Sequence, residues 1–193
     1  LYIQSLESQN KLSIATNLEH IFKFNIDNKL IGEDLFIIAG PCSVESEEMI
    51  ISISKELKVM GVNALRGGAF KPCTFPVKES IRGWKEGLQE EGLKYLSMAK
   101  EESGLPIVSE IMDINHLELC LDYIDVVQVG TRNFQNYTLL DALGKIDKPV
   151  LLKRGTWGTI DEILGSVERI LVGGNEKVII CLRGVVGMPS YRH

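Results

Sequence analysis

The chain has 193 residues, of which 45% are hydrophobic and 24% charged, and its formal net charge is −5. These values are typical of one globular domain with a sizeable core. The acidic balance argues against nucleic acid or an anionic membrane as a partner, and no apolar run approaches the ~20 residues of a membrane span.

The four cysteines give no disulfide framework, because the chain is long and cysteine-poor and no Cys-x-x-Cys pair occurs. We therefore expect reduced thiols and a cytoplasmic protein. The sequence starts at Leu1 rather than Met, so we expect it to be part of a longer product.

Residues 1–34 read as an N-terminal extension with a β-hairpin that turns at Asp27-Asn28. Beyond it, short runs rich in Val, Ile and Leu predict six strands buried on both faces, at residues 35–40, 62–68, 105–111, 124–130, 148–155 and 177–184. Amphipathic segments between them predict helices at residues 46–61, 92–104, 114–123, 136–145 and 159–174. In the first helix we expect one apolar stripe from Met49 to Met60.

This alternation indicates an α/β fold with parallel strands, either a (β/α) barrel or an open doubly wound sheet. No Gly-x-Gly-x-x-Gly follows the first strand, which argues against dinucleotide binding. Polar residues end nearly every strand, and a barrel brings all strand ends to one mouth. We therefore predict a (β/α)8 TIM barrel over residues 35–193, with six β/α units present and the chain truncated after the sixth strand.

Basic side chains recur at the predicted strand ends: Arg66 and Lys71, Arg132, Lys153 with Arg154, and Arg183. Glycines and a proline within "LRGGAFKPCT" hold the first two close together. Such a cluster suits a ligand with more than one anionic group, such as a phosphate and a carboxylate. The alternative is that each cation extends into solvent or pairs with a nearby acid.

Cys42 stands where the first strand ends, in "IIAGPCSVES". A free cysteine is commonly a small buried hydrophobe, but this position beside the cations also suits a metal ligand or a nucleophile. We assign Cys120 and Cys181, which lie inside apolar runs, to packing. His20 and His116 lie on helix-like segments and are expected at the surface or in packing contacts.

Five motifs, "AGPCSVES", "RGGAFKP", "VSEIMD", "VVQVGTRNFQNYTLL" and "KPVLLKRG", together resemble 3-deoxy-D-arabino-heptulosonate 7-phosphate synthase over about residues 24–187. The sister family, 3-deoxy-manno-octulosonate 8-phosphate synthase, shares the first motif. Its Lys-Ala-Asn-Arg-Ser and "QIPAF" segments are absent from this chain.

The resemblance implies a (β/α)8 barrel that condenses phosphoenolpyruvate with erythrose 4-phosphate, releases phosphate and opens the shikimate pathway to aromatic amino acids. It implies a divalent metal ion (Mn, Fe, Co or Zn) with Cys42 as a thiolate ligand, and a homo-oligomer. Lys71 would lie between the substrates as the catalytic residue. The phosphoenolpyruvate site would comprise Arg66, Lys71, Arg132, Lys153 and Arg183. Glu110 and Gln128 would line the same pocket, and Thr74 would face the aldose phosphate.

The chain departs from the family at Cys73, where an arginine normally holds the aldose phosphate; Lys78, Arg82 or Lys85 could supply that charge. The family's other metal ligands would come from two further strands. Three hypotheses therefore stay open: a synthase seen incompletely, a non-catalytic phosphoenolpyruvate-binding barrel fragment, and a synthase for another aldose phosphate, as in 3-deoxy-manno-octulosonate 8-phosphate synthesis.

Overall fold

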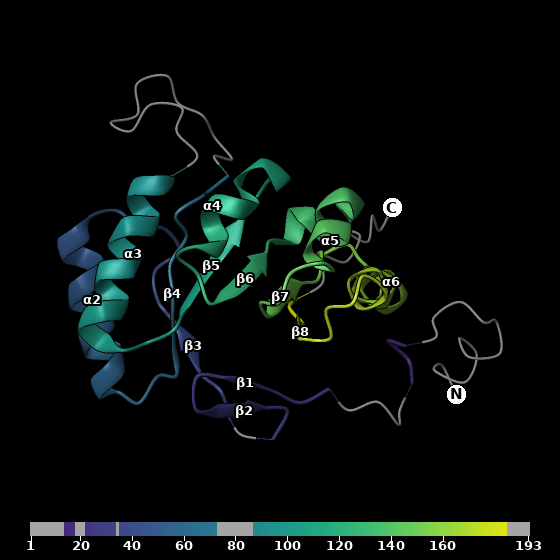
Figure 1. Cartoon of the computed structure of the whole chain (residues 1–193), viewed down its shortest axis with the longest axis horizontal. Helices are drawn as coiled ribbons and strands as arrows, with labels where there is room; N and C mark the ends of the chain where they lie inside the picture. Colours follow the sequence, from purple (N-terminus) through teal and green to yellow (C-terminus); the bar gives the residue numbers. More distant parts are fainter. Residues whose placement is uncertain (1–13, 18–21, 34, 73–86, 185–193) are drawn as a thin grey trace, which may run out of the picture. The chain divides into compact units, whose positions relative to one another are not determined.

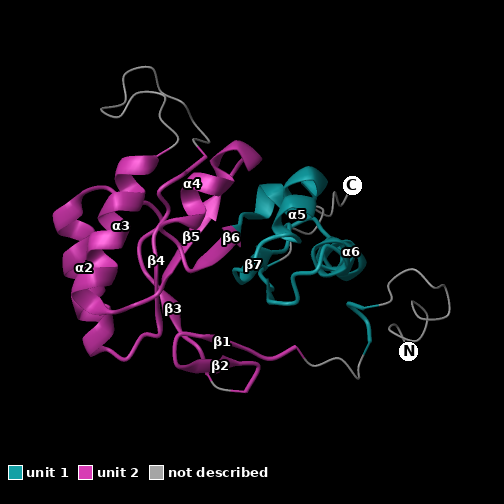
Figure 2. Ribbon diagram, viewed as in Figure 1, with its two compact units in different colours: residues 1–21, 129–193 teal, residues 22–128 magenta. Residues whose placement is uncertain are grey.

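The computed structural model describes residues 14–17, 22–33, 35–72 and 87–184. The chain divides into two units, which Figure 2 colours separately. Unit 1 comprises Leu1–Ile21 and Val129–His193, and unit 2 comprises Phe22–Gln128. The division falls inside strand β6, Val126–Val129, and each unit is described by itself.

Unit 2 begins with an antiparallel hairpin of β1, Phe24–Ile26, and β2, Lys29–Ile31. The two-residue turn between them is Asp27-Asn28, and Asp27 has φ 52°. Aspartate is among the few residues other than glycine that enter this left-handed region readily. The hairpin therefore turns at the residue pair that the sequence indicates.

The rest of unit 2 alternates strands and helices (Figure 1). Its strands are β3, Ile38–Ala39; β4, Ala64–Arg66; β5, Ile107–Ile111; and β6. Its helices are α2, Glu47–Val59; α3, Glu90–Ser103; the 3-10 helix η1, Ile114–His116; and α4, Leu117–Leu121. Each lies within two residues of a predicted segment.

Helix α2 begins where Ser46 caps it, because the Ser46 hydroxyl accepts a hydrogen bond from the Met49 amide at 3.2 Å. It lies beside α3 (Figure 1), and a 2.8 Å ion pair between Lys55 and Glu102 joins the two helices. The predicted apolar stripe is wrong at Met60, which is 73% exposed. That residue follows the last helical turn, so it no longer lies on the packed face.

Unit 1 continues the alternation after β6. Its elements are the 3-10 helix η2, Thr131–Asn133; α5, Tyr137–Leu143; β7, Val150–Lys153; α6, Ile160–Val172; and β8, Val178–Cys181. A capping box starts α6, because the Thr159 hydroxyl accepts from the Glu162 amide while the Glu162 carboxylate accepts from the Thr159 amide. The amides of Ile14 and Ala15 donate to the Glu168 carboxylate of α6.

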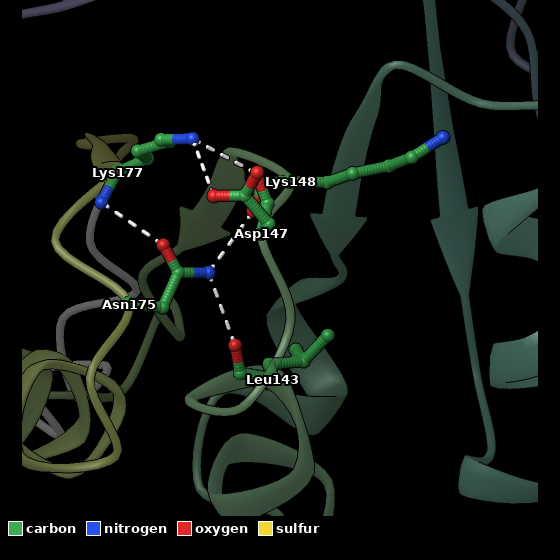
Figure 3. Close-up of polar contacts among 5 residues, drawn as sticks. All are labelled: Leu143, Asp147, Lys148, Asn175 and Lys177. Atoms are coloured by element: carbon green, nitrogen blue, oxygen red, sulfur yellow. Dashed lines mark hydrogen bonds and ion pairs between the residues drawn. The ribbon is translucent and has the colours of Figure 1, made fainter.

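The segments that lead into β7 and β8 are joined by Asn175 (Figure 3). Its amide nitrogen donates to the carbonyl oxygens of Leu143 and Lys148, at 3.0 and 2.9 Å. Its side-chain oxygen accepts from the Lys177 amide at 3.0 Å. Asn175 is only 4% exposed, so one buried side chain holds three backbone groups before the two strands start.

The larger sheet has the strand order β3-β4-β5-β6-β7-β8, which is also the chain order. The pairs β3–β4, β4–β5 and β7–β8 are parallel. A doubly wound sheet would reverse its strand order at a switch point, whereas a barrel adds strands in sequence. The prediction of a partial (β/α) barrel is therefore confirmed, and the described sheet contains six strands.

Strand β8 differs from the expectation of a strand buried on both faces. Ile180 is 37% exposed, and Leu182 just beyond the strand is 65% exposed. Because β8 ends the strand order of the described sheet, it has a described strand beside only one edge. Among the described helices, none has the length and apolar character needed to cross a membrane.

Candidate functional site

The loop after β3 is held against the end of β4. Arg66 Nη1 donates to the Pro41 carbonyl oxygen at 3.2 Å, and the Val44 amide donates to the Gly68 carbonyl oxygen at 3.0 Å. Glycine is required at Gly40, which has φ 145° and where a Cβ would lie 1.9 Å from the Arg66 carbonyl oxygen. This close approach carries Cys42 to the carboxyl end of β4.

Cys42 and Lys71 form the central contact of unit 2. The Lys71 ammonium donates to the Cys42 sulfur at 2.8 Å. This hydrogen bond lowers the pKa of the Cys42 thiol; partial burial opposes the shift, and the positive charges of Lys71 and Arg66 add to it. Cys42 is exposed, so its sulfur lies within reach of solvent, beside Lys71 and Arg66.

The segment that carries Lys71 is supported from behind. The Phe70 ring stacks on His116, with the ring centroids 4.5 Å apart, and Phe70 is fully buried. The Ala69 amide approaches the Ser109 hydroxyl of β5 at 3.4 Å. Of the two places expected for His116, the surface or a packing contact, the structure shows a packing contact with Phe70. The sequence does not indicate that this partner adjoins Lys71.

Glu110 and Gln128 lie near the ends of β5 and β6 and are joined directly. Gln128 Nε2 donates to a Glu110 carboxylate oxygen at 2.9 Å. Gln128 is 1% exposed and Glu110 is half-buried. One of the two N–H donors of the buried amide is directed at Glu110, and this bond fixes the orientation of the amide. The sequence places these two residues at strand ends, and the structure pairs them.

Unit 1 contains a second group of basic side chains, after β6, β7 and β8. Arg183 Nη1 donates to the Thr131 hydroxyl at 2.7 Å, and Arg154 Nη2 donates to the Arg183 carbonyl oxygen at 2.6 Å. Arg183 and Arg132 are exposed, whereas Lys153, which ends β7, is half-buried. Sequence reasoning missed Thr131, because a threonine after a strand carries no distinctive signal, and it assigned no separate role to Arg154.

The predicted site residues thus fall into two sets. In unit 2 the structure brings Cys42, Arg66 and Lys71 together and pairs Glu110 with Gln128. In unit 1 the predicted residues are Arg132, Lys153 and Arg183. Thr74 lies outside the described residues, as do Cys73, Lys78, Arg82 and Lys85, so the predictions for the aldose phosphate stay predictions.

The described residues offer few ligands to a metal ion. They contain no group of three or more His, Cys, Asp or Glu side chains that could hold one. A zinc site, structural or catalytic, usually has at least three protein ligands. Cys42 is therefore a single candidate donor, and the described residues do not by themselves form a complete metal centre.

Comparison with known proteins identifies the sequence family. The chain matches the DAHP synthetase I family over residues 13–192. It is 46% identical over 156 residues to phospho-2-dehydro-3-deoxyheptonate aldolase of Thermotoga maritima, covering 80% of this chain and 44% of that relative. It is 30% identical over 168 residues to 2-dehydro-3-deoxyphosphooctonate aldolase of Desulfatibacillum aliphaticivorans, covering 83% of this chain and 60% of the relative.

A solved structure agrees with these matches. The crystal structure of phospho-2-dehydro-3-deoxyheptonate aldolase (DAHP synthase) from Thermotoga maritima superposes with a TM-score of 0.82 at 40% sequence identity. The match covers 93% of this chain and 51% of that structure, so the chain spans about half the length of the protein it resembles. The family match and this shared fold show that the chain belongs to the DAHP synthetase I family.

Proposed function

We propose that the complete protein is a 3-deoxy-D-arabino-heptulosonate 7-phosphate synthase. It would join phosphoenolpyruvate to erythrose 4-phosphate through a new carbon–carbon bond, consume one water and release phosphate. Family membership supports the reaction class. The observation that carries the proposal is the 2.8 Å contact between the Lys71 ammonium and the Cys42 sulfur, beside Arg66.

In unit 2, Arg66 and Lys71 are proposed to bind the anionic groups of phosphoenolpyruvate. A guanidinium binds a carboxylate or phosphate through two parallel hydrogen bonds, and an ammonium adds a compact point charge. Lys71 is also proposed to move a proton during the reaction, because an ammonium beside a second ionisable group can donate one. Glu110 and Gln128 would line this pocket with one carboxylate and one oriented amide.

In unit 1, Arg132, Lys153 and Arg183 are proposed as further contacts to phosphoenolpyruvate. All three follow or end a strand, which is the position where α/β barrels carry substrate-binding residues. Thr74 is proposed to contact the aldose phosphate. These assignments follow from the motifs that carry each residue.

We propose Cys42 as one ligand of a divalent metal ion in the complete protein. The lowered pKa of its thiol favours the thiolate, which is the form that binds metals. A divalent ion of this class polarises a carbonyl as a Lewis acid when bound. The other ligands would come from outside the described residues.

The test is phosphate release by the complete protein with phosphoenolpyruvate and erythrose 4-phosphate, together with metal content by mass spectrometry. We expect Lys71→Met and Cys42→Ala to lose activity, and Cys42→Ala also to lose bound metal. Cys120→Ala is the matched control, because Cys120 is 1% exposed in the core and should not affect turnover. Parent-like turnover in Lys71→Met would overturn the role proposed for the contact between Lys71 and Cys42.

The same assay separates the remaining hypotheses. Calorimetric binding of phosphoenolpyruvate without phosphate release from any aldose would indicate a non-catalytic binder. Turnover only with the aldose phosphate used in octulosonate synthesis would indicate the activity named for the relative of 30% identity. Turnover with erythrose 4-phosphate supports the proposal.

A further inference from the structure

Arg154 is a buried arginine at the carboxyl end of β7. It is 9% exposed, and its backbone amide donates to the Cys181 carbonyl oxygen of β8 at 3.1 Å. Its side chain bonds the chain two residues beyond Cys181, where Nη2 donates to the Arg183 carbonyl oxygen at 2.6 Å. Among the described residues its Nε has no hydrogen-bond partner and no carboxylate pairs with it.

Stability alone gives a poor reason for an arginine at this position. A buried cation without a carboxylate keeps much of its desolvation cost, and replacing buried charges with apolar groups of similar volume is often neutral or stabilising. Within the described part of the chain, the side chain of Arg154 makes one hydrogen bond, to the carbonyl oxygen of the exposed residue Arg183, and water could replace it. The position therefore calls for a functional explanation.

The contacts of Arg183 supply one. Its guanidinium donates to the Thr131 hydroxyl, and its carbonyl oxygen accepts from Arg154. Arg183 is thus held at both the side chain and the backbone, by residues that follow β6 and β7. A guanidinium has five N–H donors, and one hydrogen bond from the Arg183 guanidinium goes to a described residue, so further donors can serve a ligand. A cation whose position is already fixed binds an anion more tightly, because less side-chain freedom is lost on binding.

We propose that Arg154 is a positioning residue that holds Arg183 for an anionic group of phosphoenolpyruvate. This inference rests on the proposed function, in which Arg183 contacts that substrate. Arg154 acts through the Arg183 backbone, so its effect on affinity should exist only when the Arg183 guanidinium is present. That dependence separates positioning from direct contact between Arg154 and the ligand.

The test is a double-mutant cycle in the complete protein with phosphoenolpyruvate as the probe. Arg154→Met, Arg183→Ala and the double variant are titrated by calorimetry, and ligand-detected NMR extends the measurement to millimolar affinities. We expect Arg154→Met to weaken binding roughly five- to thirtyfold in the parent and to have almost no effect when residue 183 is alanine. Its melting temperature should equal or exceed that of the parent.

The matched control is Arg169→Met. Arg169 is in the same unit, but it is a surface residue of α6 that pairs with Asp141 of α5 at 2.7 Å. Its loss removes the same charge from the protein and should leave the affinity for phosphoenolpyruvate unchanged. Equal weakening by Arg154→Met and Arg169→Met would show a general charge effect and overturn the inference.

The remaining outcomes are also decisive. If Arg183→Ala binds phosphoenolpyruvate as the parent does, the proposed role of Arg183 fails. If Arg183→Ala weakens binding while Arg154→Met does not, or if their effects add fully, positioning by Arg154 is wrong. Should Arg154→Met fail to fold, Arg154→Lys keeps the charge without the planar fork. Weaker binding at a parent-like melting temperature then supports the inference, and parent-like affinity overturns it.

Discussion

The two ends of strands β7 and β8 use polar side chains in opposite ways. Before the strands start, Asn175 is 4% exposed and both ends of its amide are bonded to backbone groups (Figure 3). After the strands end, Arg183 is exposed and its guanidinium bonds one threonine hydroxyl. A buried amide therefore joins the two strands before they start, whereas an exposed guanidinium lies beyond their carboxyl ends.

This difference follows from the geometry of parallel β/α units. Their carboxyl ends carry substrate-binding residues, whereas residues at the amino ends contribute mainly to stability. Changes at the carboxyl ends should therefore alter ligand affinity and leave unfolding unchanged. Loss of buried hydrogen bonds at the amino ends should do the reverse.

The largest effect is expected at the carboxyl end, from Lys153→Ala. Loss of one partner of a desolvated ion pair with a ligand typically costs ~2–5 kcal/mol of binding free energy. Calorimetry should show that loss for phosphoenolpyruvate, with the urea midpoint of unfolding close to the parent's. Arg132→Ala should behave alike. Affinities within twofold of the parent would contradict the roles proposed for both residues.

The largest effect on stability is expected at the amino end, from Asn175→Ala. This change leaves two carbonyl oxygens and one amide without their partner, which we expect to cost about 2–3 kcal/mol of unfolding free energy. Urea unfolding measures it. Asn175→Asp is the control. It keeps the acceptor for the Lys177 amide but turns an anionic oxygen toward two carbonyl oxygens, so we expect it to be no more stable than Asn175→Ala. An unchanged midpoint in both variants would remove the contrast.

A smaller effect distinguishes the two described cysteines of unit 2, Cys42 and Cys120. The Lys71 hydrogen bond lowers the pKa of Cys42, whereas burial raises the pKa of Cys120 to about 12. A lowered pKa keeps the thiolate present at lower pH, so alkylation of Cys42 by iodoacetamide in chelator-treated native protein should persist below the pH range of an ordinary thiol. Lys71→Met should move that profile upward by removing the main cause.

Cys120 provides the internal reference for the same experiment. Its burial should prevent alkylation of the native protein at pH 8, and denaturation should release it. Peptide mass spectrometry follows each thiol separately. If Cys42 in Lys71→Met reacts with the pH profile of the parent, the hydrogen bond is not what sets its reactivity.

The smallest effect is expected from Asp147→Asn, which removes the ion pair with Lys177. Lys177 lowers the pKa of Asp147, so any contribution to stability is present above the ordinary aspartate pKa and is lost as the pH falls. The Asp147 side chain is fully exposed, and solvent and salt screen the pair. The urea midpoint at neutral pH should be that of the parent. A shift as large as that of Asn175→Ala would contradict the expectation that this exposed, screened ion pair contributes less than the buried hydrogen bonds of Asn175.

Local pattern determined much of this protein. Continuous apolar runs predicted all six strands of the larger sheet, and the Asp27-Asn28 pair predicted the hairpin turn, because burial and backbone preference act over a few residues. The basic residues and Cys42 could be placed at strand ends for the same reason. Their roles toward substrate and metal, and the division into residues 1–34 and 35–193, stay predictions.

Only the tertiary structure decided which of these residues meet. Cys42 and Lys71 are separated by 29 positions, and Arg183 and Thr131 by 52, so neither contact follows from spacing along the chain. The burial of Arg154 and the exposure of Met60 also depend on what packs against each side chain. A sequence pattern records which face of an element is apolar, whereas a contact or a shifted pKa depends on the partner that a distant segment brings within a few ångströms.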